Sequence, residues 1–369
     1  MTTLSREDLS TWLTEDALPL WSQIGWDAAS GTVWEALDHQ GAPLTAMPKR
    51  LRVQARQAYC FAAAAPQAPH LPDLPDKARA LFRFAMTRGV DPETGNLGAL
   101  LAPDGSLMEA PHDLYDIAFM LLASSALIEA GEKIDADLAW LEAALARLEA
   151  PRGWFETAAP GPRRRQNPHM HMFECSTALY AATREPRFLA MAETCLDLFR
   201  DVFLQPNGDV FEYFDTDWTP VTEGQTVEPG HMAEWIYLLD AYEQASGRST
   251  GVDLELIFGR VWAARDAAGA LPDRSDPPAG TRRSWPQTEL LKASLVLQRR
   301  GHSLPEGARP DEVMGMLWRE YLDVPVRGGW YDKRSCDGAL LSQNMPASTF
   351  YHILVALNMY LEQAAPAPA

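Results

Sequence analysis

Two short segments of the sequence bring ionisable side chains together at spacings that suit proton transfer. In the first, NPHMHMFECSTALY, His169, His171 and Glu174 lie within six positions. On a helix His171 and Glu174 are three residues apart and share a face, whereas His169 points elsewhere. A strand would instead let the two histidines chelate a metal. The apolar run that follows favours a helix, so the metal site is the weaker interpretation, and a histidine that only caps or packs the helix stays open.

The second segment, EPGHMAEWIYLL, holds His231 and Glu234 three residues apart. Pro229 and Gly230 break the chain before a helix, so both ionisable side chains are expected on one face of its first turn. A carboxylate beside an imidazole raises the pKa of the imidazole and orients its ring, as in a general acid or base. A glutamate that only complements the helix dipole fits the pattern equally well.

Three further polar side chains interrupt apolar surroundings. His352 lies within FYHIL, where a histidine satisfied in the core is more common than a catalyst. In SWPQTELLKA, Trp285 could stack on a ring and Glu289 follows on the same helix, although a buried tryptophan with an exposed glutamate fits as well. Arg56 interrupts an apolar helix face and needs a partner, either a core carboxylate or a substrate oxygen.

Together these side chains indicate a site for a neutral, polyhydroxylated ligand. The sequence contains no glycine-rich phosphate loop, GxSxG elbow or HExxH helix. Hydrolysis of a glycosidic bond usually needs two carboxyl groups that flank the bond, and the histidines here outnumber the convincing carboxylates. Two alternatives stay open: a metal-dependent sugar isomerase that uses His169, His171 and Glu174, and a glycan-binding barrel without catalytic activity.

Helices are predicted to position these residues. Apolar spacings of three and four, with start and stop signals, predict helices over 50–65, 114–130, 138–150, 233–246, 288–300 and 348–363. Strand signals are few, and the best of them, residues 208–218, predicts a hairpin within a loop.

The polar positions that stand out recur at intervals of 55 to 63 residues. Such an interval is the length of two helices with their loops, and six such hairpins would use the whole chain. Stacked hairpins form an open solenoid or close into a ring, and closure would bring one position of each hairpin to a central cavity. The recurring positions are Arg56, Asp116, His171, His231, Glu289 and His352.

Composition restricts the class of protein. The 369 residues, 47% hydrophobic and 22% charged, can bury a large core, and a net charge of −18 predicts repulsion from nucleic acids and anionic membranes. The four cysteines form no CxxC pair, and neither a signal peptide nor a run of eighteen apolar residues is visible. These features predict a cytoplasmic protein with one domain over residues 1–369, ending in a frayed Pro/Ala tail.

Six motifs, in chain order, resemble the N-acylglucosamine 2-epimerase family across residues 50–355. They are RLRVQARQAYCF, LYDIAF, NPHMHMFE, EPGHMAEW, WPQTELLKA and MPASTFYHI. The resemblance implies an all-α fold, an (α/α)6 barrel of six helical hairpins, which agrees with the repeat described above. It also implies an isomerase of monosaccharides that needs no cofactor and no metal, and that moves the C2 proton through an enediol or enediolate.

The same motifs imply a role for individual residues. His352 is similar to the principal general base of the family, and His231 with Glu234 to the pair that serves in ring opening and proton transfer. Arg56 resembles the arginine that contacts the sugar oxygens near C1 and C2. The remaining matches, which bind the sugar or line the pocket, are Tyr115, Asp116, Asn167, His171, Glu174, Trp285 and Glu289.

The family contains 2-epimerases, cellobiose 2-epimerases and aldose–ketose isomerases. Cellobiose 2-epimerases usually carry a tryptophan five residues before the last histidine, where this chain has Ala347, which counts against a disaccharide. The sequence PASTFYHI resembles mannose isomerases and the related sulfoquinovose isomerases. The expected reaction is therefore the interconversion of D-mannose and D-fructose by a monomer or homodimer, with a sugar 2-epimerase as the alternative. Because His231 and His352 are both present, the residues alone do not separate the two reactions.

Overall fold

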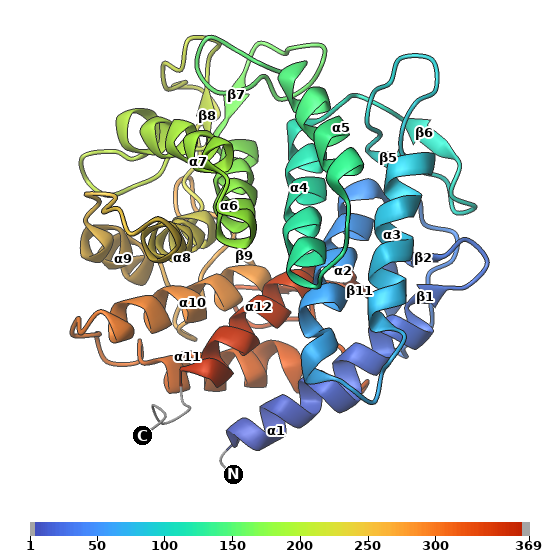
Figure 1. Cartoon of the computed structure of the whole chain (residues 1–369). Helices are drawn as coiled ribbons and strands as arrows, with labels where there is room; N and C mark the ends of the chain where they lie inside the picture. The colour runs from blue at the N-terminus through green and yellow to red at the C-terminus, as the bar shows by residue number, and fades with distance from the viewer. Residues whose placement is uncertain (1–3, 364–369) are drawn as a thin grey trace.

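Six long helices pack side by side in a closed ring at the centre of the molecule. The computed structural model describes residues 4–363. Each helix of the ring contacts the next one along the chain, and the last contacts the first (Figure 1). These inner helices are α2 (Leu51–Ala64), α4 (Leu114–Glu129), α6 (Gln166–Thr183), α8 (Pro229–Ser246), α10 (Trp285–Arg299) and α12 (Ser348–Glu362).

A second set of helices covers the ring on the outside. Each outer helix follows an inner helix along the chain and packs against it, and α3 buries a face in which Ala78, Leu81, Phe82 and Ala85 recur at helical spacing. The predicted all-α (α/α)6 barrel is thereby confirmed. The outer helices are α3 (Leu74–Arg88), α5 (Asp135–Ala146), α7 (Pro186–Leu198), α9 (Leu254–Ala263) and α11 (Pro310–Leu317).

The sixth pair of helices is assembled from the two ends of the chain, whereas the sequence predicted six consecutive hairpins. The helix α1 (Arg6–Thr11), extended by π-helical segments over Trp12–Ala17 and Leu20–Ile24, packs against α12 (Figure 1). The indole of Trp21 in this segment is fully buried and stacks on Trp330 with 4.7 Å between ring centroids. The repeat therefore holds for every inner helix, while α12 takes its outer partner from the N-terminal segment.

Local sequence signals set where the inner helices begin and end. The carboxylate of Asp113 caps α4 by accepting a hydrogen bond from the Tyr115 amide. Pro229 occupies the first turn of α8, where its missing N–H breaks no hydrogen bond, and Gly247 ends the same helix with a left-handed φ of 70°. The predicted starts are therefore correct to within a few residues, and the polar motifs fall on the first turns.

Within residues 4–363, eleven short strands lie in the loops, and all pair antiparallel. β4 (Lys49–Arg50), β7 (Arg164–Arg165), β9 (Thr281–Arg283) and β11 (Asn344–Pro346) come just before inner helices and pair with β5 (Leu100–Leu101), β8 (Tyr213–Phe214), β10 (Lys333–Ser335) and β3 (Ala36–Asp38). β6 (Leu107–Glu109) extends β5, and β1 (Trp26–Asp27) pairs with β2 (Thr32–Val33).

The strand signal over residues 208–218, which predicted a loop hairpin, forms one in part: Phe214 bridges Pro220 antiparallel across a turn in which the Asp215 amide donates to the Thr219 carbonyl. Tyr213 and Phe214 pair with Arg165 and Arg164 of the preceding hairpin loop. The residues after them turn away because the Asp215 carboxylate accepts hydrogen bonds from the amides of Asp217 and Thr219. Within residues 4–363, no helix combines the length and the apolar composition needed to cross a membrane. The tail expected to fray lies largely outside the described residues.

Candidate active site

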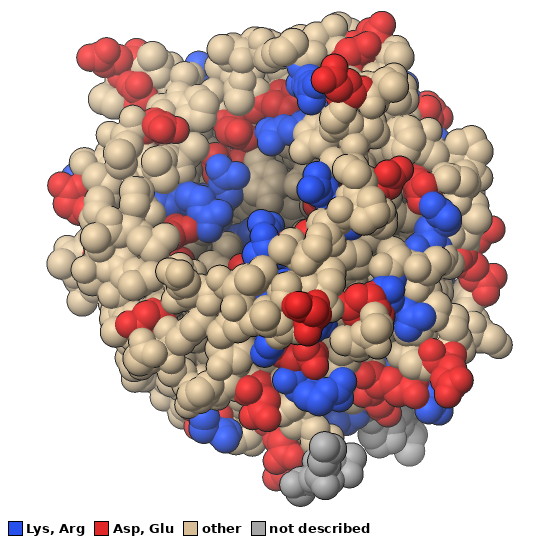
Figure 2. All heavy atoms as spheres, turned by 180° about the vertical axis from the view of Figure 1, so that it is seen from behind, with Lys and Arg blue, Asp and Glu red and all other residues tan. Residues whose placement is uncertain are grey.

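A cavity of about 460 Å³ opens at the end of the ring where the inner helices begin. Figure 2 shows this side of the molecule hollowed near its centre, with Lys and Arg side chains around the hollow. Because the helices point their N-termini at one space, their partial positive charges favour negative charge within it. Eight of the predicted site residues line the cavity, from all six inner helices: Arg56, Tyr115, Asn167, His171, His231, Glu234, Trp285 and His352.

Three predicted site residues are absent from the cavity wall. Asp116, which the resemblance places in the wall, is fully buried and lies 3.1 Å from Arg52 Nε, while burial raises the pKa of its carboxyl group to about 7. Glu174 and Glu289 contact the Nδ1 atoms of His171 and His352. In this structure these three carboxyl groups support side chains of the wall or its surroundings, and their direct contact with substrate stays a prediction.

His352 is connected to a buried chain of charges on α10. Its Nδ1 lies 2.8 Å from Glu289 Oε1, and Glu289 Oε2 lies 2.6 Å from Lys292 Nζ. Burial lowers the pKa of His352 to about 4, although Glu289 opposes this effect. A neutral imidazole that donates from Nδ1 to a carboxylate leaves Nε2 as a proton acceptor. His352 therefore has the protonation state that a general base needs at neutral pH.

His231 has the opposite character. Its Nδ1 lies 2.9 Å from Glu212 Oε1 and 3.5 Å from Glu228 Oε2. Burial opposes a charge on the ring, but the two carboxylates outweigh it and raise the pKa of His231 to about 10. The Asn167 amide nitrogen lies 3.1 Å from Nε2, and turning the amide over lets its otherwise unpartnered Oδ1 accept from the protonated ring.

Glu234 is not the partner of His231, contrary to the expectation from their spacing. Glu212 takes this position because Gln166, at the start of α6, holds its carboxylate through a hydrogen bond of 2.9 Å. Sequence reasoning missed Glu212, since the segment around it carried only a strand signal. Burial, together with Glu289, raises the pKa of Glu234 well above its usual range. Glu234 is therefore a neutral acid that lines the cavity.

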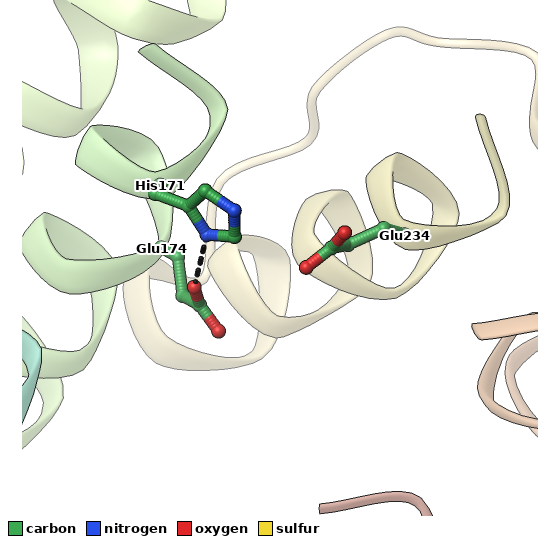
Figure 3. A group of neighbouring side chains, drawn as sticks. All are labelled: His171, Glu174 and Glu234. Atoms are coloured by element: carbon green, nitrogen blue, oxygen red, sulfur yellow. Dashed lines mark hydrogen bonds and ion pairs between the residues drawn. The ribbon is translucent and has the colours of Figure 1, made fainter. Parts of the chain in front are cut away.

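Figure 3 shows Glu234, on α8, facing the pair formed by His171 and Glu174 on α6. His171 Nδ1 lies 2.9 Å from Glu174 Oε2, and Tyr351 donates its hydroxyl proton to the other oxygen of Glu174. Potential ligand atoms of His171, Glu174 and Glu234 lie within 4.8 Å of one another. Lys292 already supplies positive charge to both carboxyl groups, which disfavours a metal cation among them.

The metal site considered from the sequence, with His169, His171 and Glu174 as ligands, is not assembled. His169 Nε2 lies 3.2 Å from the Trp154 amide nitrogen, and the His169 ring packs at 5.0 Å from the ring of Trp218. His169 is fully buried and does not line the cavity. The helix predicted for this segment explains the result, because it turns His169 away from the face that His171 and Glu174 share.

Arg56 and Trp285 offer two different surfaces to a ligand. Arg56 Nη2 donates to the Tyr115 hydroxyl at 2.9 Å, and its guanidinium lies 4.1 Å from the ring centroid of Phe119. Within residues 4–363 this guanidinium has no ion-pair partner and contacts only the Tyr115 hydroxyl and the Ser348 carbonyl by hydrogen bonds, so its charge is available to ligand oxygens. The Trp285 ring lies 5.1 Å from the ring of His231 and 5.5 Å from that of His352, as an apolar plate between the two histidines.

The sequence analysis did not predict three cationic side chains of the cavity mouth, which are Arg165, Arg283 and Lys333. Arg283 and Lys333 line the cavity directly opposite each other in the β9–β10 pair, where like charges repel. Lys333 Nζ lies 3.6 Å from Asp273, whereas Arg165 and Arg283 have no carboxylate within 4 Å among residues 4–363. A local signal existed, because Arg165 directly precedes α6 and Arg283 lies two residues before α10.

Comparisons with known proteins agree with this geometry. The family model of N-acylglucosamine 2-epimerase (GlcNAc 2-epimerase) matches residues 32–356. A protein of Rhizobium meliloti (strain 1021) named mannose-6-phosphate isomerase is 35% identical over 96% of each chain. A D-mannose isomerase of Thermobifida fusca is 27% identical over 65% of this chain and 67% of its own.

Two solved structures have the same fold at low sequence identity. A D-mannose isomerase superposes with a TM-score of 0.83 at 19% identity, covering 98% of this chain and 99% of its own. Cellobiose 2-epimerase from Spirochaeta thermophila DSM 6192 superposes with a TM-score of 0.81 at 22% identity, covering 99% of this chain and 100% of its own.

Proposed function

This chain belongs to the N-acylglucosamine 2-epimerase family as a sugar isomerase or epimerase, and from that premise we propose that it interconverts D-mannose and D-fructose without a metal ion. The observation that carries the proposal is the pair of histidines that face one cavity in opposite protonation states. His352 is neutral and positioned to accept a proton, while His231 is protonated and positioned to donate a hydrogen bond.

The proposed reaction begins with the open-chain aldose. His352 Nε2 takes the proton from C2, the C1–C2 bond becomes the double bond of an enediolate, and negative charge develops on O1. His231 and Arg56 stabilise this charge together with the N-termini of the inner helices. Return of the proton from His352 to C1, with transfer of the O2 proton to the medium and uptake of a proton at O1, completes the ketose. Glu234, a neutral acid in the same cavity, is the proposed donor for ring opening.

A 2-epimerase is the alternative within the same chemistry. It would need a proton returned to C2 from the opposite face of the enediolate, and the protonated His231 could supply it. Two observations favour the isomerase. The most similar relatives described above carry the names of isomerases. Ala347 is fully buried and offers no aromatic plate for the second sugar of a disaccharide, which counts against a cellobiose 2-epimerase.

The test is incubation with D-mannose in D₂O with a chelator, followed by proton NMR. Formation of D-fructose supports the metal-free isomerase, and deuterium at C1 would show exchange of the transferred proton with solvent. D-glucose that carries deuterium at C2 would make the protein an epimerase. Fructose that forms only after the chelator is removed would contradict the metal-free mechanism, and no reaction at all would contradict mannose as the substrate.

A phosphorylated mannose is a second candidate substrate, favoured by the cationic cavity mouth and by the name of the Rhizobium meliloti relative. Arg283→Gln is expected to lower kcat/KM for D-mannose 6-phosphate by at least about tenfold and to leave kcat/KM for D-mannose unchanged. Arg260→Gln, which changes an arginine paired with Asp209 on the outer ring, is the matched control. Equal losses for both sugars would exclude a phosphate site at Arg283.

The absence of a cofactor, a cytoplasmic location and a monomeric or homodimeric state stay predictions from the sequence.

A further inference from the structure

The reaction proposed above gives no role to the lysine buried on α10. We propose that Lys292 is a positioning residue that keeps Glu289 ionised, so that Glu289 holds His352 in the tautomer that accepts a proton at Nε2. The proposal rests on the proposed function, because it concerns the base of that reaction. Lys292 itself does not line the cavity and touches no substrate.

The geometry places the three groups in a continuous line. Lys292 follows Glu289 by three residues on α10, so both side chains share one face of the helix, and both are 0% exposed. Lys292 Nζ lies 2.6 Å from Glu289 Oε2, and Glu289 Oε1 lies 2.8 Å from His352 Nδ1. Each oxygen of the carboxylate therefore has a different partner, and the lysine reaches the imidazole only through Glu289.

Other inner helices surround this line with groups that do not replace the lysine. From α8, the Tyr237 ring lies 4.2 Å from Lys292 Nζ, and Glu234 faces Glu289 and His352. The charges that also act on the site are Arg56 on α2 and the pair of His171 and Glu174 on α6, while Tyr351 lies beside His352 on α12.

Nothing on the outer ring takes the place of Lys292 either. Glu289 pairs with Lys292 on its own helix and with His352 on α12, and neither α9 nor α11 contributes an ion-pair partner to Glu289 or Lys292. β9 places Arg283 at the cavity mouth. Within residues 4–363, Lys292 is the only lysine or arginine within 4 Å of the Glu289 carboxylate.

Three glutamates in this region form an internal comparison. Burial raises the pKa of Glu174 to about 7 and that of Glu234 well above its usual range. Burial acts in the same direction on Glu289, but Lys292 and His352 outweigh it and lower the pKa. Glu289 differs from the other two by its direct ion pair with a lysine. Without that cation, Glu289 is expected to bind a proton as its neighbours do.

The protonation of Glu289 decides what His352 can do. An ionised carboxylate only accepts, so it fixes the proton of the neutral imidazole on Nδ1 and leaves Nε2 open. A protonated Glu289 can donate to Nδ1, which moves the imidazole proton to Nε2 and removes the acceptor from the cavity. Lys292 thereby controls the base without touching it.

A second buried lysine offers a matched control. Lys49 is also 0% exposed, lies 2.6 Å from the carboxylate of Asp27 and packs over the ring of Trp34. It does not line the cavity. Lys292→Met and Lys49→Met each leave a buried carboxylate without its lysine, so both are expected to lose stability. Only Lys292→Met is expected to alter His352.

The first experiment follows the ring nitrogens of His352 by NMR as the pH is changed, with His352→Ala used to assign the signals. This readout requires no turnover, so it separates a failure of this proposal from a failure of the proposed function. In the parent protein and in Lys49→Met, Nδ1 should carry the proton at neutral pH. In Lys292→Met, the proton should move to Nε2. An unchanged tautomer in folded Lys292→Met would overturn the proposal.

The second experiment measures mannose turnover against pH. Lys292→Met should lower kcat at neutral pH by at least about tenfold with little change in KM, since the substrate contacts remain. The acid limb of kcat/KM should move to higher pH by about one unit or more, as Glu289 replaces His352 as the group that must lose a proton. A loss of stability with the acid limb in place would assign Lys292 a structural role only.

A double variant keeps the test decisive if Lys292→Met does not fold. Glu289→Gln with Lys292→Met removes both charges at once and leaves no unpaired ion in the core. It should fold and retain no more activity than Glu289→Gln, because both changes act through the same hydrogen bond to His352. Activity close to that of the parent protein in the double variant would contradict the proposal.

Discussion

Two histidines face the same cavity in opposite protonation states, and their carboxylate partners explain the difference. His231 is enclosed by Glu212 and Glu228, whose combined charge overcomes the effect of burial and keeps the ring protonated. His352 has a single partner, Glu289, and the charge of that carboxylate is shared with Lys292. Burial therefore prevails at His352 and leaves it neutral. The same type of side chain therefore serves as an acid at His231 and as a base at His352.

His352→Ala should abolish most turnover and leave the fold intact. Removing a general base lowers kcat by about 10²- to 10⁴-fold, while a truncated side chain at the cavity wall disturbs the core little. The measurement is mannose turnover beside a thermal unfolding curve. His302→Ala is the control, since His302 is one-third exposed and pairs with Glu255 on the outer ring. Retention of most activity in His352→Ala would rule out its role as the base.

Glu212→Gln should move the basic limb of the pH–rate profile to lower pH. The pKa of His231 is raised to about 10, so the protonated form is lost only as the pH rises through that value. Removing the nearest carboxylate lets the effect of burial lower the pKa, and the acid is then lost earlier. The measurement is kcat/KM against pH, and Glu234→Gln, which removes a carboxyl group that does not contact His231, is the comparison. An identical basic limb in Glu212→Gln would contradict this assignment.

The same pair of groups links stability to pH. Because the folded pKa of His231 is higher than its usual value of 6.5, the pair contributes its full stability below that pH and loses it as the pH rises toward about 10. Glu212→Gln should therefore lower the free energy of unfolding most at pH 6 and least above pH 10. Urea unfolding at the two pH values measures the difference.

The sequence was sufficient to predict which side chains meet and insufficient to predict which charges pair. His231 and His352 were found because their motifs recur at a regular interval and resemble a known family. Glu212, the partner of His231, was missed because an ion pair across two elements depends on tertiary contacts that local spacing does not encode, and the ion pair of Lys292 with Glu289 was missed as well. Glu234 was assigned to His231 from helical spacing, yet a carboxylate from another loop lies closer.

The inner helices act on the site through their first two turns. All six begin at one end of the ring, so these turns supply ten of the nineteen residues of the cavity wall, and their N-terminal dipoles favour the same negative charge. This arrangement requires neighbouring helix starts to approach closely. Gly230, in the first turn of α8, permits one such close approach, because it leaves room for Trp285 at the start of α10.

Gly230→Ala should weaken both folding and substrate binding. The added Cβ would lie 2.7 Å from Trp285 Cη2 and 2.9 Å from Pro286 Cβ, so the start of α10 must shift. Such overpacking destabilises a protein by about 1–3 kcal/mol, and the displaced indole should raise KM. Urea unfolding and steady-state kinetics measure the two effects.

The control for Gly230→Ala lies on an outer helix. Gly259 on α9 has no atom within 4 Å of an added Cβ, so Gly259→Ala should be neutral or stabilise the protein by about 0.5–1 kcal/mol. Equal unfolding free energies for Gly230→Ala and the parent protein would contradict the close approach of the two helix starts.

The elements were predictable to different degrees for physical reasons. Helix starts and ends are local, so Asp113, Pro229 and Gly247 could be identified from the sequence alone. The pairing of β7 with β8 joins residues about fifty positions apart, and two-residue strands carry too little pattern to specify a partner. The cavity mouth, which these strands build, was therefore the least predictable part of the site.

At the scale of the whole molecule, the ring depends on both ends of the chain. The inner helices follow one another in sequence, but α12 is covered by the segment that contains α1, more than 300 residues away. The period of the polar residues predicted the ring and could not predict this closure, since the N-terminal segment carries none of the polar positions. The contact is buried and aromatic: Trp21 stacks on Trp330, which in turn lies 5.9 Å from Phe350 of α12.

Trp21→Ala should therefore destabilise the whole barrel without altering its chemistry. Truncation of a fully buried tryptophan usually lowers the free energy of unfolding by about 3–5 kcal/mol. Trp21 does not line the cavity, so kcat and KM of the folded fraction should match those of the parent protein. Trp262→Ala, at a partly exposed stack on the outer helix α9, should lower stability much less. If closure by the N-terminal segment contributes little, the two variants will unfold at the same urea concentration, and the ring will have to be regarded as stable from α2 to α12 on its own.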